Sequence, residues 1–166
     1  MKSLKSKFIV LTLISLGLPV MSWAKGAPKI TASETKMFGV GPVIGDPLGV
    51  NGKYWLQQSP MAVQGIIGYD LTDSALAISG DGLYHFKNVT TLDFPWDAGQ
   101  VALYGGLGGK LSFPKKTRFT IRIPLGANVL YGGQDWDLFG ELVPGIRVAP
   151  DSGGSFDFGV GMRYYF

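Results

Sequence analysis

Cysteine is absent from this chain of 166 residues, and histidine occurs once, as His85. The absence of cysteine excludes a disulfide framework, a thiolate metal site, a cysteine nucleophile and a lipid-anchored cysteine. One histidine leaves little basis for a histidine-rich metal centre. From these residues we predict neither a metal site nor a cofactor.

Charge is also scarce, because Asp, Glu, Lys and Arg make up 16% of the residues, where soluble domains usually have about 25%. The formal net charge of +3 hints at an acidic partner, but Lys2, Lys5 and Lys7 supply all of that excess. Without these three lysines, 12 basic residues face 12 acidic ones. The sequence therefore gives no electrostatic support for nucleic-acid binding.

No apolar run reaches the roughly 18 residues that a membrane-spanning helix needs. The longest run, 8–18, follows the three lysines and ends at Pro19. Small residues lead up to Ala24, which completes the pattern of a secretory signal peptide cleaved after that residue. We predict three regions: a signal peptide over 1–24, a flexible periplasmic lead-in over 25–34 and one domain over 35–166.

Glycine and a two-residue period dominate the rest of the chain. The 25 glycines are about twice the usual share, and apolar residues alternate with polar or small ones between dense turn signals. Eight segments show this alternation: 38–44, 50–56, 62–70, 75–86, 101–110, 118–131, 136–148 and 155–166. Their even number and short connections favour an antiparallel up-and-down meander.

The two faces of these segments differ in a way that indicates what surrounds the sheet. One face is apolar and uncharged, and in the last segment it carries Phe156, Phe158, Val160, Met162, Tyr164 and Phe166. The other face is rich in glycine and carries charges, among them Asp137. A soluble barrel would turn its charges outward. Here the small and charged residues suit a narrow interior and the large apolar ones a wide lipid-facing surface, which is typical of a transmembrane barrel.

We therefore predict an all-β protein, a closed eight-stranded antiparallel up-and-down transmembrane β-barrel. Eight membrane strands of about 9–11 residues fit within the domain, and closure satisfies the backbone groups that lipid cannot hydrogen-bond. Inward charges need partners. We expect a lumenal ion-pair network of Lys53, Asp81, Arg122, Glu141, Arg147, Asp157 and Arg163.

Prolines and aromatic residues should mark the edges of the membrane. Pro42, Pro124 and Pro144 each remove a hydrogen-bond donor from a strand, so we expect them near the membrane rims or at bulges. Aromatic rings with one polar edge favour the membrane interfaces. Candidates for these girdles are Trp55, Trp96, Trp136, Tyr54, Tyr84, Tyr131 and Tyr164.

The C-terminus carries the most specific pattern, because Phe158, Val160, Met162, Tyr164 and Phe166 share one face and the last residue is aromatic. This end resembles that of the outer-membrane barrels of Gram-negative bacteria, where it is the signal read by the barrel-assembly machinery. Together with the signal peptide it makes the chain similar to the small eight-stranded barrels of the OmpA and OmpX type. The resemblance implies a location in the bacterial outer membrane.

Four segments look still closer to a family of uncharacterised outer-membrane barrels, some members of which are surface proteins of spirochaetes. These segments are Gly52–Leu56, Arg122–Gly126, Phe139–Pro144 and the terminal strand. The activity of that family is unknown, so the resemblance transfers no functional residue.

Catalysis has one histidine candidate, His85. Some small barrels modify lipids, among them a lipid A deacylase with a His-x-Ser pair, but here Phe86 and Lys87 follow the histidine. Ser79 shares the face of His85 yet lies about 20 Å away along an extended strand, too far for a nucleophile–base pair. A serine from another strand stays open. We assign no catalytic residue and expect a lumenal or rim position for His85.

The predicted function is that of a monomeric integral outer-membrane protein with a structural or surface-interaction role. Its expected partners are membrane lipid, the barrel-assembly machinery and, as a further candidate, an extracellular ligand bound by the loops. The alternatives are a small lipid A deacylase or acyltransferase, and a narrow pore or ligand-binding barrel. Side chains fill the interior of an eight-stranded barrel, which weighs against the pore.

Overall fold

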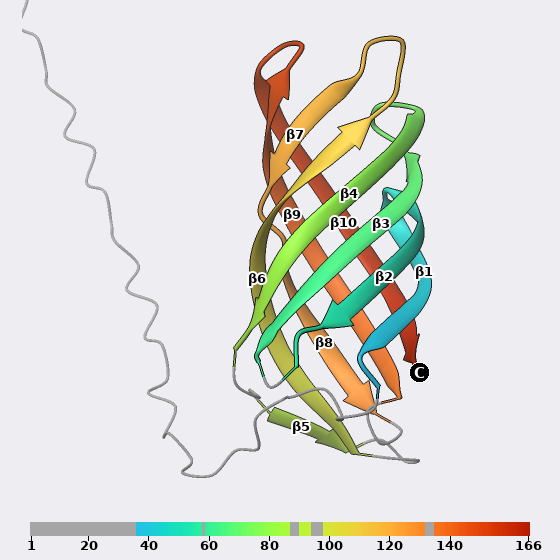
Figure 1. Ribbon diagram of the computed structural model, residues 1–166, viewed down its shortest axis with the longest axis vertical. Coiled ribbons are helices and arrows are strands. Elements are labelled where there is room, and N and C mark those ends of the chain that lie inside the picture. The colour runs from blue at the N-terminus through green and yellow to red at the C-terminus, as the bar shows by residue number, and fades with distance from the viewer. Residues whose placement is uncertain (1–35, 58, 87–89, 94–97, 132–134) are drawn as a thin grey trace, which may run out of the picture.

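The computed structural model describes residues 36–57, 59–86, 90–93, 98–131 and 135–166. The predicted signal peptide and lead-in lie outside these ranges. The described residues form one antiparallel sheet that curls into a barrel (Figure 1). Its strands are β1 Phe38–Asp46, β2 Leu48–Trp55, β3 Met61–Asp70, β4 Ala75–His85, β5 Thr90–Asp93, β6 Ala98–Ser112, β7 Arg118–Arg122, β8 Leu125–Tyr131, β9 Trp136–Ala149 and β10 Gly153–Tyr165.

The sheet closes because its first and last strands pair with each other. β1 is bonded to β2 on one side and to β10 on the other, with Gly39 opposite Tyr165 and Asp46 opposite Phe158. Apart from β5, the described strands occupy eight positions around the barrel, which we call lanes. β7 and β8 follow each other in one lane, and each of the other strands has a lane of its own. The predicted closed eight-stranded antiparallel barrel is therefore confirmed as a fold.

The lane shared by β7 and β8 lies between β6 and β9. β7 and β8 pair with β6 in the same register, although residues 123 and 124 separate them. The ladder is interrupted at Pro124, because proline has no backbone N–H to donate. The flanking Ile123 N–H still donates to the carbonyl of Pro144 at 2.9 Å. The lane thus corresponds to the single strand predicted over 118–131.

Two of the expectations about strand ends and prolines are wrong. β6 begins at Ala98, because its first residues pair with β5, a short strand that the alternation did not predict. The three prolines do not lie at rims or bulges. Pro42 lies inside β1, Pro144 lies inside β9, and Pro124 lies between β7 and β8 in the middle of their shared lane. Their missing donors are tolerated because the register continues unchanged past each of them.

Side chains alternate between the lumen and the outside along the long strands. On β4, Asp81 and His85 are buried, whereas Ile78 and Tyr84 are about half exposed. Among the described residues 33 large apolar side chains are exposed, and no charged residue occupies an outward position of a barrel strand. The outer surface is therefore an apolar belt, and the charges of the strands point inward.

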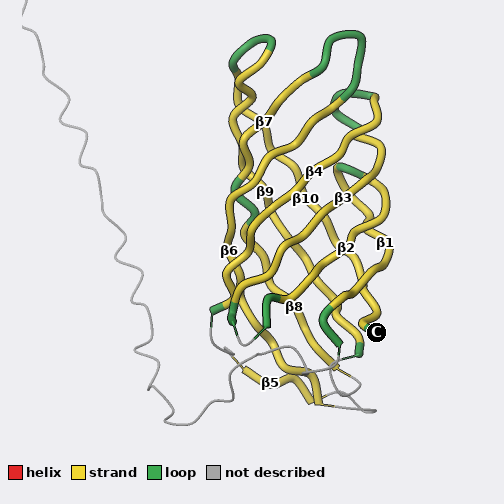
Figure 2. Tube along the Cα trace, viewed as in Figure 1, coloured by secondary structure: helices red, strands yellow, loops and turns green. Residues whose placement is uncertain are grey.

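The barrel has two distinct ends. The C-terminal end carries Phe38, Phe166, the β2–β3 connection, the end of β8 and the start of β9. We call the other end, with the β1–β2, β3–β4, β6–β7 and β9–β10 turns, the distal end; it is at the top of Figure 2. The described residues contain no helix of the length and hydropathy needed to span a membrane.

Candidate functional site

The candidate site is the lumen, which is filled with charged and polar side chains. Ten ionised residues there are at most 6% exposed, and every one of the eight lanes contributes at least one. They are Asp46, Lys53, Asp70, Asp81, Lys110, Arg122, Asp137, Glu141, Asp157 and Arg163. Because buried charges destabilise a fold unless they are paired, the arrangement of these ten groups decides whether the barrel is stable.

Arg163 is the centre of the ion cluster nearer the C-terminal end. Its Nη1 donates to Asp137 Oδ2 at 2.8 Å, its Nη2 donates to Gln64 Oε1 at 2.6 Å, and its Nε donates to Asn51 Oδ1. The guanidinium carbon lies 3.6 Å from the centroid of the Phe139 ring. The guanidinium thus donates hydrogen bonds from its edge and stacks on an aromatic ring with its flat face. A lysine ammonium could not replace it, because it has neither the planar set of donors nor the flat face.

Lys53 shares the carboxylate of Asp137 with Arg163. Its Nζ lies 3.6 Å from Asp137 Oδ2 and 2.9 Å from His85 Nε2. The same ammonium lies 4.4 Å from the centroid of the Trp55 ring, within cation–π distance. One buried carboxylate therefore faces two buried cations, and aromatic faces stabilise the second of them.

Arg122 is the centre of a second cluster nearer the distal end. Its Nε lies 3.1 Å from Asp81 Oδ1, its Nη2 3.5 Å from Glu141 Oε1 and its Nη1 3.8 Å from Asp157 Oδ2. Three carboxylates from β4, β9 and β10 thus surround one guanidinium. The cluster ties together strands that are not neighbours in the sheet.

Lys110 extends this cluster toward the distal end. Its Nζ donates to both oxygens of Asp157, at 2.8 and 2.7 Å, and lies 2.9 Å from Asp70 Oδ2. Ser112 donates its hydroxyl to the same oxygen of Asp70 at 3.0 Å. Asp70, Asp81, Glu141 and Asp157 therefore each have a cation within 4 Å.

Gln64 and Tyr104 join the two clusters through Glu141. Gln64 donates its Nε2 to Glu141 Oε2 at 3.0 Å while its Oε1 accepts from Arg163, and the Tyr104 hydroxyl donates to Glu141 Oε2 at 3.1 Å. The result is one continuous polar network from Lys53 to Lys110. It cross-links the barrel wall along most of its length.

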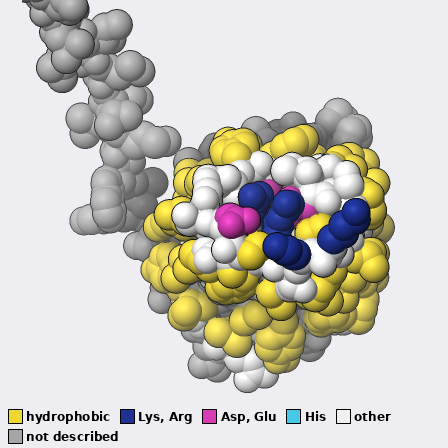
Figure 3. All heavy atoms as spheres, turned by 90° about the horizontal axis from the view of Figure 1, so that it is seen from above, with side chains coloured by type: hydrophobic (Ala, Val, Ile, Leu, Met, Phe, Trp, Pro, Cys, Tyr) yellow, Lys and Arg dark blue, Asp and Glu magenta, His cyan; other side chains and the backbone are white. Residues whose placement is uncertain are grey.

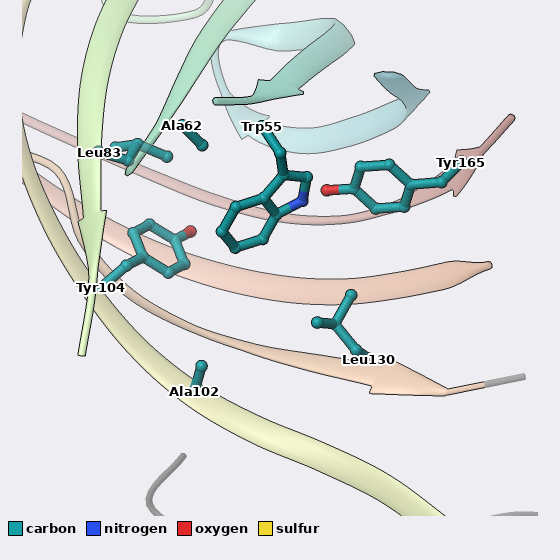
Figure 4. Close-up of a cluster of buried hydrophobic side chains, with 7 residues drawn as sticks. All are labelled: Trp55, Ala62, Leu83, Ala102, Tyr104, Leu130 and Tyr165. Carbon is teal, nitrogen blue, oxygen red and sulfur yellow. The ribbon is translucent and has the colours of Figure 1, made fainter. Parts of the chain in front are cut away.

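A layer of apolar and aromatic side chains fills the lumen toward the C-terminal end (Figure 4). Its members, all at most 4% exposed, are Trp55, Ala62, Leu83, Ala102, Tyr104, Leu130 and Tyr165. Figure 4 shows Trp55 between the rings of Tyr104 and Tyr165. The prediction that Trp55 lies in a membrane girdle is therefore wrong. It follows Lys53 by two residues in β2, so both side chains point into the lumen.

His85 belongs to this layer and is 2% exposed. Its ring lies 4.3 Å from Trp55 and 5.1 Å from Tyr104 between centroids, and its Nε2 contacts Lys53. In the described part of the chain no serine hydroxyl bonds to it, and no group of three or more potential ligands is arranged to hold a metal ion. The surroundings of His85 are those of a packed lumenal side chain.

The distal rim is tied together by two aspartates. Asp46 accepts from the backbone N–H of Leu71 at 2.9 Å and of Thr72 at 3.1 Å, which links the β1–β2 and β3–β4 turns. Asp73 pairs with Arg118 of β7 and lies 3.7 Å from Arg147 Nη2 of β9. Of the seven residues expected in the lumenal network, Arg147 is thus the exception, since it pairs at the rim and not with the other six.

Sequence reasoning missed several members of the network. Lys110, Asp70 and Gln64 occupy inward positions of β6 and β3, but none of them is in the lumenal network that the sequence predicts. The glycines before Lys110 hide the alternation of β6. An extension of the two-residue period through these glycines would have placed Lys110 in the lumen.

The five residues of the expected C-terminal assembly signal lie on the outside of β10 and at its end. Phe158, Val160, Met162, Tyr164 and Phe166 are between 36% and 64% exposed. At the C-terminal end Tyr164 packs on Trp136, with ring centroids 4.9 Å apart, and Trp136 stacks near Tyr131 at 6.5 Å. These rings form part of an aromatic band; Trp96 lies outside the described residues.

No protein-family model matches this chain. Comparisons with curated proteins and with solved structures find no match either. The fold and the lumen geometry are therefore the basis on which a function can be argued.

Proposed function

We propose that this protein is an integral outer-membrane β-barrel with a structural or surface-interaction role and no catalytic centre. The observation that carries the proposal is the sidedness of the barrel. Outward positions of its strands carry no charge among the described residues, while ten ionised residues are buried inside.

A soluble setting fits this surface poorly. Monomeric soluble proteins rarely expose a contiguous apolar patch larger than roughly 300–600 Å², whereas here the apolar belt surrounds the barrel. Lipid would cover that belt, and closure of the sheet would leave no unpaired strand edge within the hydrocarbon. The aromatic band at the C-terminal end fits the place where lipid chains meet headgroups.

The filled lumen supports a scaffold over a pore or an enzyme. Arg163, Arg122 and Trp55 each lie across the interior and are at most 2% exposed. His85 lies beneath the same packing, away from the outer surface on which lipid chains would lie. Its environment therefore offers less support for lipid A modification than for packing.

The test is the location of the protein in cells, with a soluble periplasmic protein as the control. We expect the mature chain to begin at Lys25 and to sediment with outer membranes. It should also migrate differently on a gel before and after boiling, because folded barrels resist detergent. Recovery in the soluble periplasmic fraction would contradict the proposal. Lipid A whose acyl chains change with the wild-type protein, but not with His85→Gln, would favour the enzyme.

A further inference from the structure

The distal end of the barrel combines a set of basic side chains with the edge of the apolar belt. Figure 3 looks down on this end and shows Lys and Arg side chains gathered around the mouth, with apolar side chains outside them. Four basic residues lie at this end outside the buried network: Lys115 and Lys116 in the β6–β7 turn, Arg118 at the start of β7 and Arg147 near the end of β9. We call these four residues the basic rim.

The basic rim has more positive charge than the acids at its surface can neutralise. Arg118 and Arg147 share a single carboxylate, that of Asp73, and both contact the same oxygen. Their side chains keep 34% and 25% exposure. Lys115, Lys116 and Asp151 are exposed, whereas the Asp73 side chain keeps only 6% exposure. With Asp46, four cations therefore face three carboxylates at this end.

Apolar side chains adjoin the basic rim directly. Phe113 precedes the two lysines by two residues and is 46% exposed, while Phe119 follows Arg118 and is 40% exposed. Val148, next to Arg147, is 46% exposed. A membrane that covered these three side chains would bring its headgroups to the depth of the cations.

The rim is also held in place. The Asp73 carboxylate connects the β3–β4 turn to β7 and β9, and Asp46 ties the β1–β2 turn to Leu71 and Thr72. A binding surface that is fixed beforehand loses less conformational entropy when a ligand binds. Guanidinium groups suit phosphate because their donors match its oxygens in pairs.

We propose that the basic rim binds the phosphate groups of anionic lipids in the leaflet that surrounds the distal end. This inference rests on the proposed membrane location. A soluble polyanion fits less well, because the cations adjoin exposed phenylalanines and not a polar surface.

The experiment uses the protein folded in nanodiscs of phosphatidylcholine with a minor share of phosphatidylglycerol. Native mass spectrometry then counts the phosphatidylglycerol molecules that stay bound after release from the disc. Lys115→Gln with Lys116→Gln should retain about tenfold less phosphatidylglycerol, since each cation near an anionic surface contributes attraction.

Lys36→Gln is the matched control at the opposite end, where Lys36 donates to Asp135 at 2.6 Å. It should leave retention unchanged. Equal retention of phosphatidylglycerol by the wild type and the double lysine variant would overturn the inference. So would a wild-type protein that retains phosphatidylcholine as well as it retains phosphatidylglycerol. Displacement of the lipid by inorganic phosphate at the same phosphate concentration would also overturn it, in favour of a free-anion site. A wild-type protein that does not enter nanodiscs at all would instead contradict the proposed function.

Discussion

Phe38 and Phe166 pack edge to face across the seam that closes the barrel, with ring centroids 5.5 Å apart and planes at 72°. The backbone N–H of Phe166 also donates to the carbonyl of Phe38 at 3.1 Å. At the C-terminal end of the barrel, the start of β1 and the residue that follows β10 are thus joined by one hydrogen bond and one aromatic contact. Phe166, which we expect to be part of the signal for the barrel-assembly machinery, is therefore also a residue that closes the barrel.

Loss of this contact should reduce membrane insertion without affecting export. We expect deletion of Phe166, or Phe166→Ser with Tyr164→Ser, to leave the chain exported but poorly inserted. The reason is that both the terminal pattern and the ring contacts with Phe38 and Trp136 are lost. Heat-modifiability of membrane fractions measures insertion. Phe156→Ser is the control, because Phe156 is exposed on the same face at the other end of β10. Normal insertion of the deletion variant would show that the terminal pattern is incidental.

A charge on the outer face should destabilise the folded barrel. Ile121 and Leu142 are 43% and 56% exposed at outward positions, so Ile121→Arg or Leu142→Arg would put a cation in hydrocarbon. The expected cost is about 2–4 kcal/mol near the midplane. Unfolding by urea in lipid vesicles gives this free energy, and Lys116→Arg serves as a control outside the belt. If Ile121→Arg unfolds like the wild type, the belt does not face lipid.

Removal of a central lumenal carboxylate should destabilise the barrel from the inside. Asp137 accepts from Arg163 and Tyr165 and faces Lys53, and none of its surface is exposed. Asp137→Ala would leave two cations unpaired, at a cost of about 3–5 kcal/mol. Asp151→Ala, in the exposed β9–β10 turn, should change stability by less than about 0.5 kcal/mol. Equal unfolding free energies for the two variants would contradict a structural role for the network.

Two glycines should respond in opposite ways to alanine. The Cβ of an alanine at Gly126 would collide with the ring and hydroxyl of Tyr104, whereas at Gly80 it would meet no atom within 4 Å. Gly126→Ala should therefore cost about 1–3 kcal/mol by overpacking. Gly80→Ala should be neutral or stabilising, because glycine in a strand loses more backbone entropy on folding. The same urea titration compares them, and a Gly126→Ala variant as stable as Gly80→Ala would contradict tight packing of Gly126 against Tyr104 and the backbone of Gly140.

The two-residue period by itself determined the class of this fold and the direction of most side chains. Alternation is a local property, since successive residues of a strand point to opposite faces whatever the neighbouring strands are. The inward positions of Lys53, Asp81 and Arg163 follow from it, as do the outward ones of Val160 and Ile121. The number of lanes also followed, because turn signals separate the segments along the chain.

Only the tertiary structure decided which charges meet. Lys110 and Asp157 are far apart in sequence and come from strands that are not neighbours, so their contact depends on the closure and register of the whole barrel. The same holds for Arg147, whose inward position predicted a lumenal partner but whose height along β9 puts it at the rim with Asp73. Direction is set by the period of the chain, whereas height and partner are set by how eight lanes stagger around one axis.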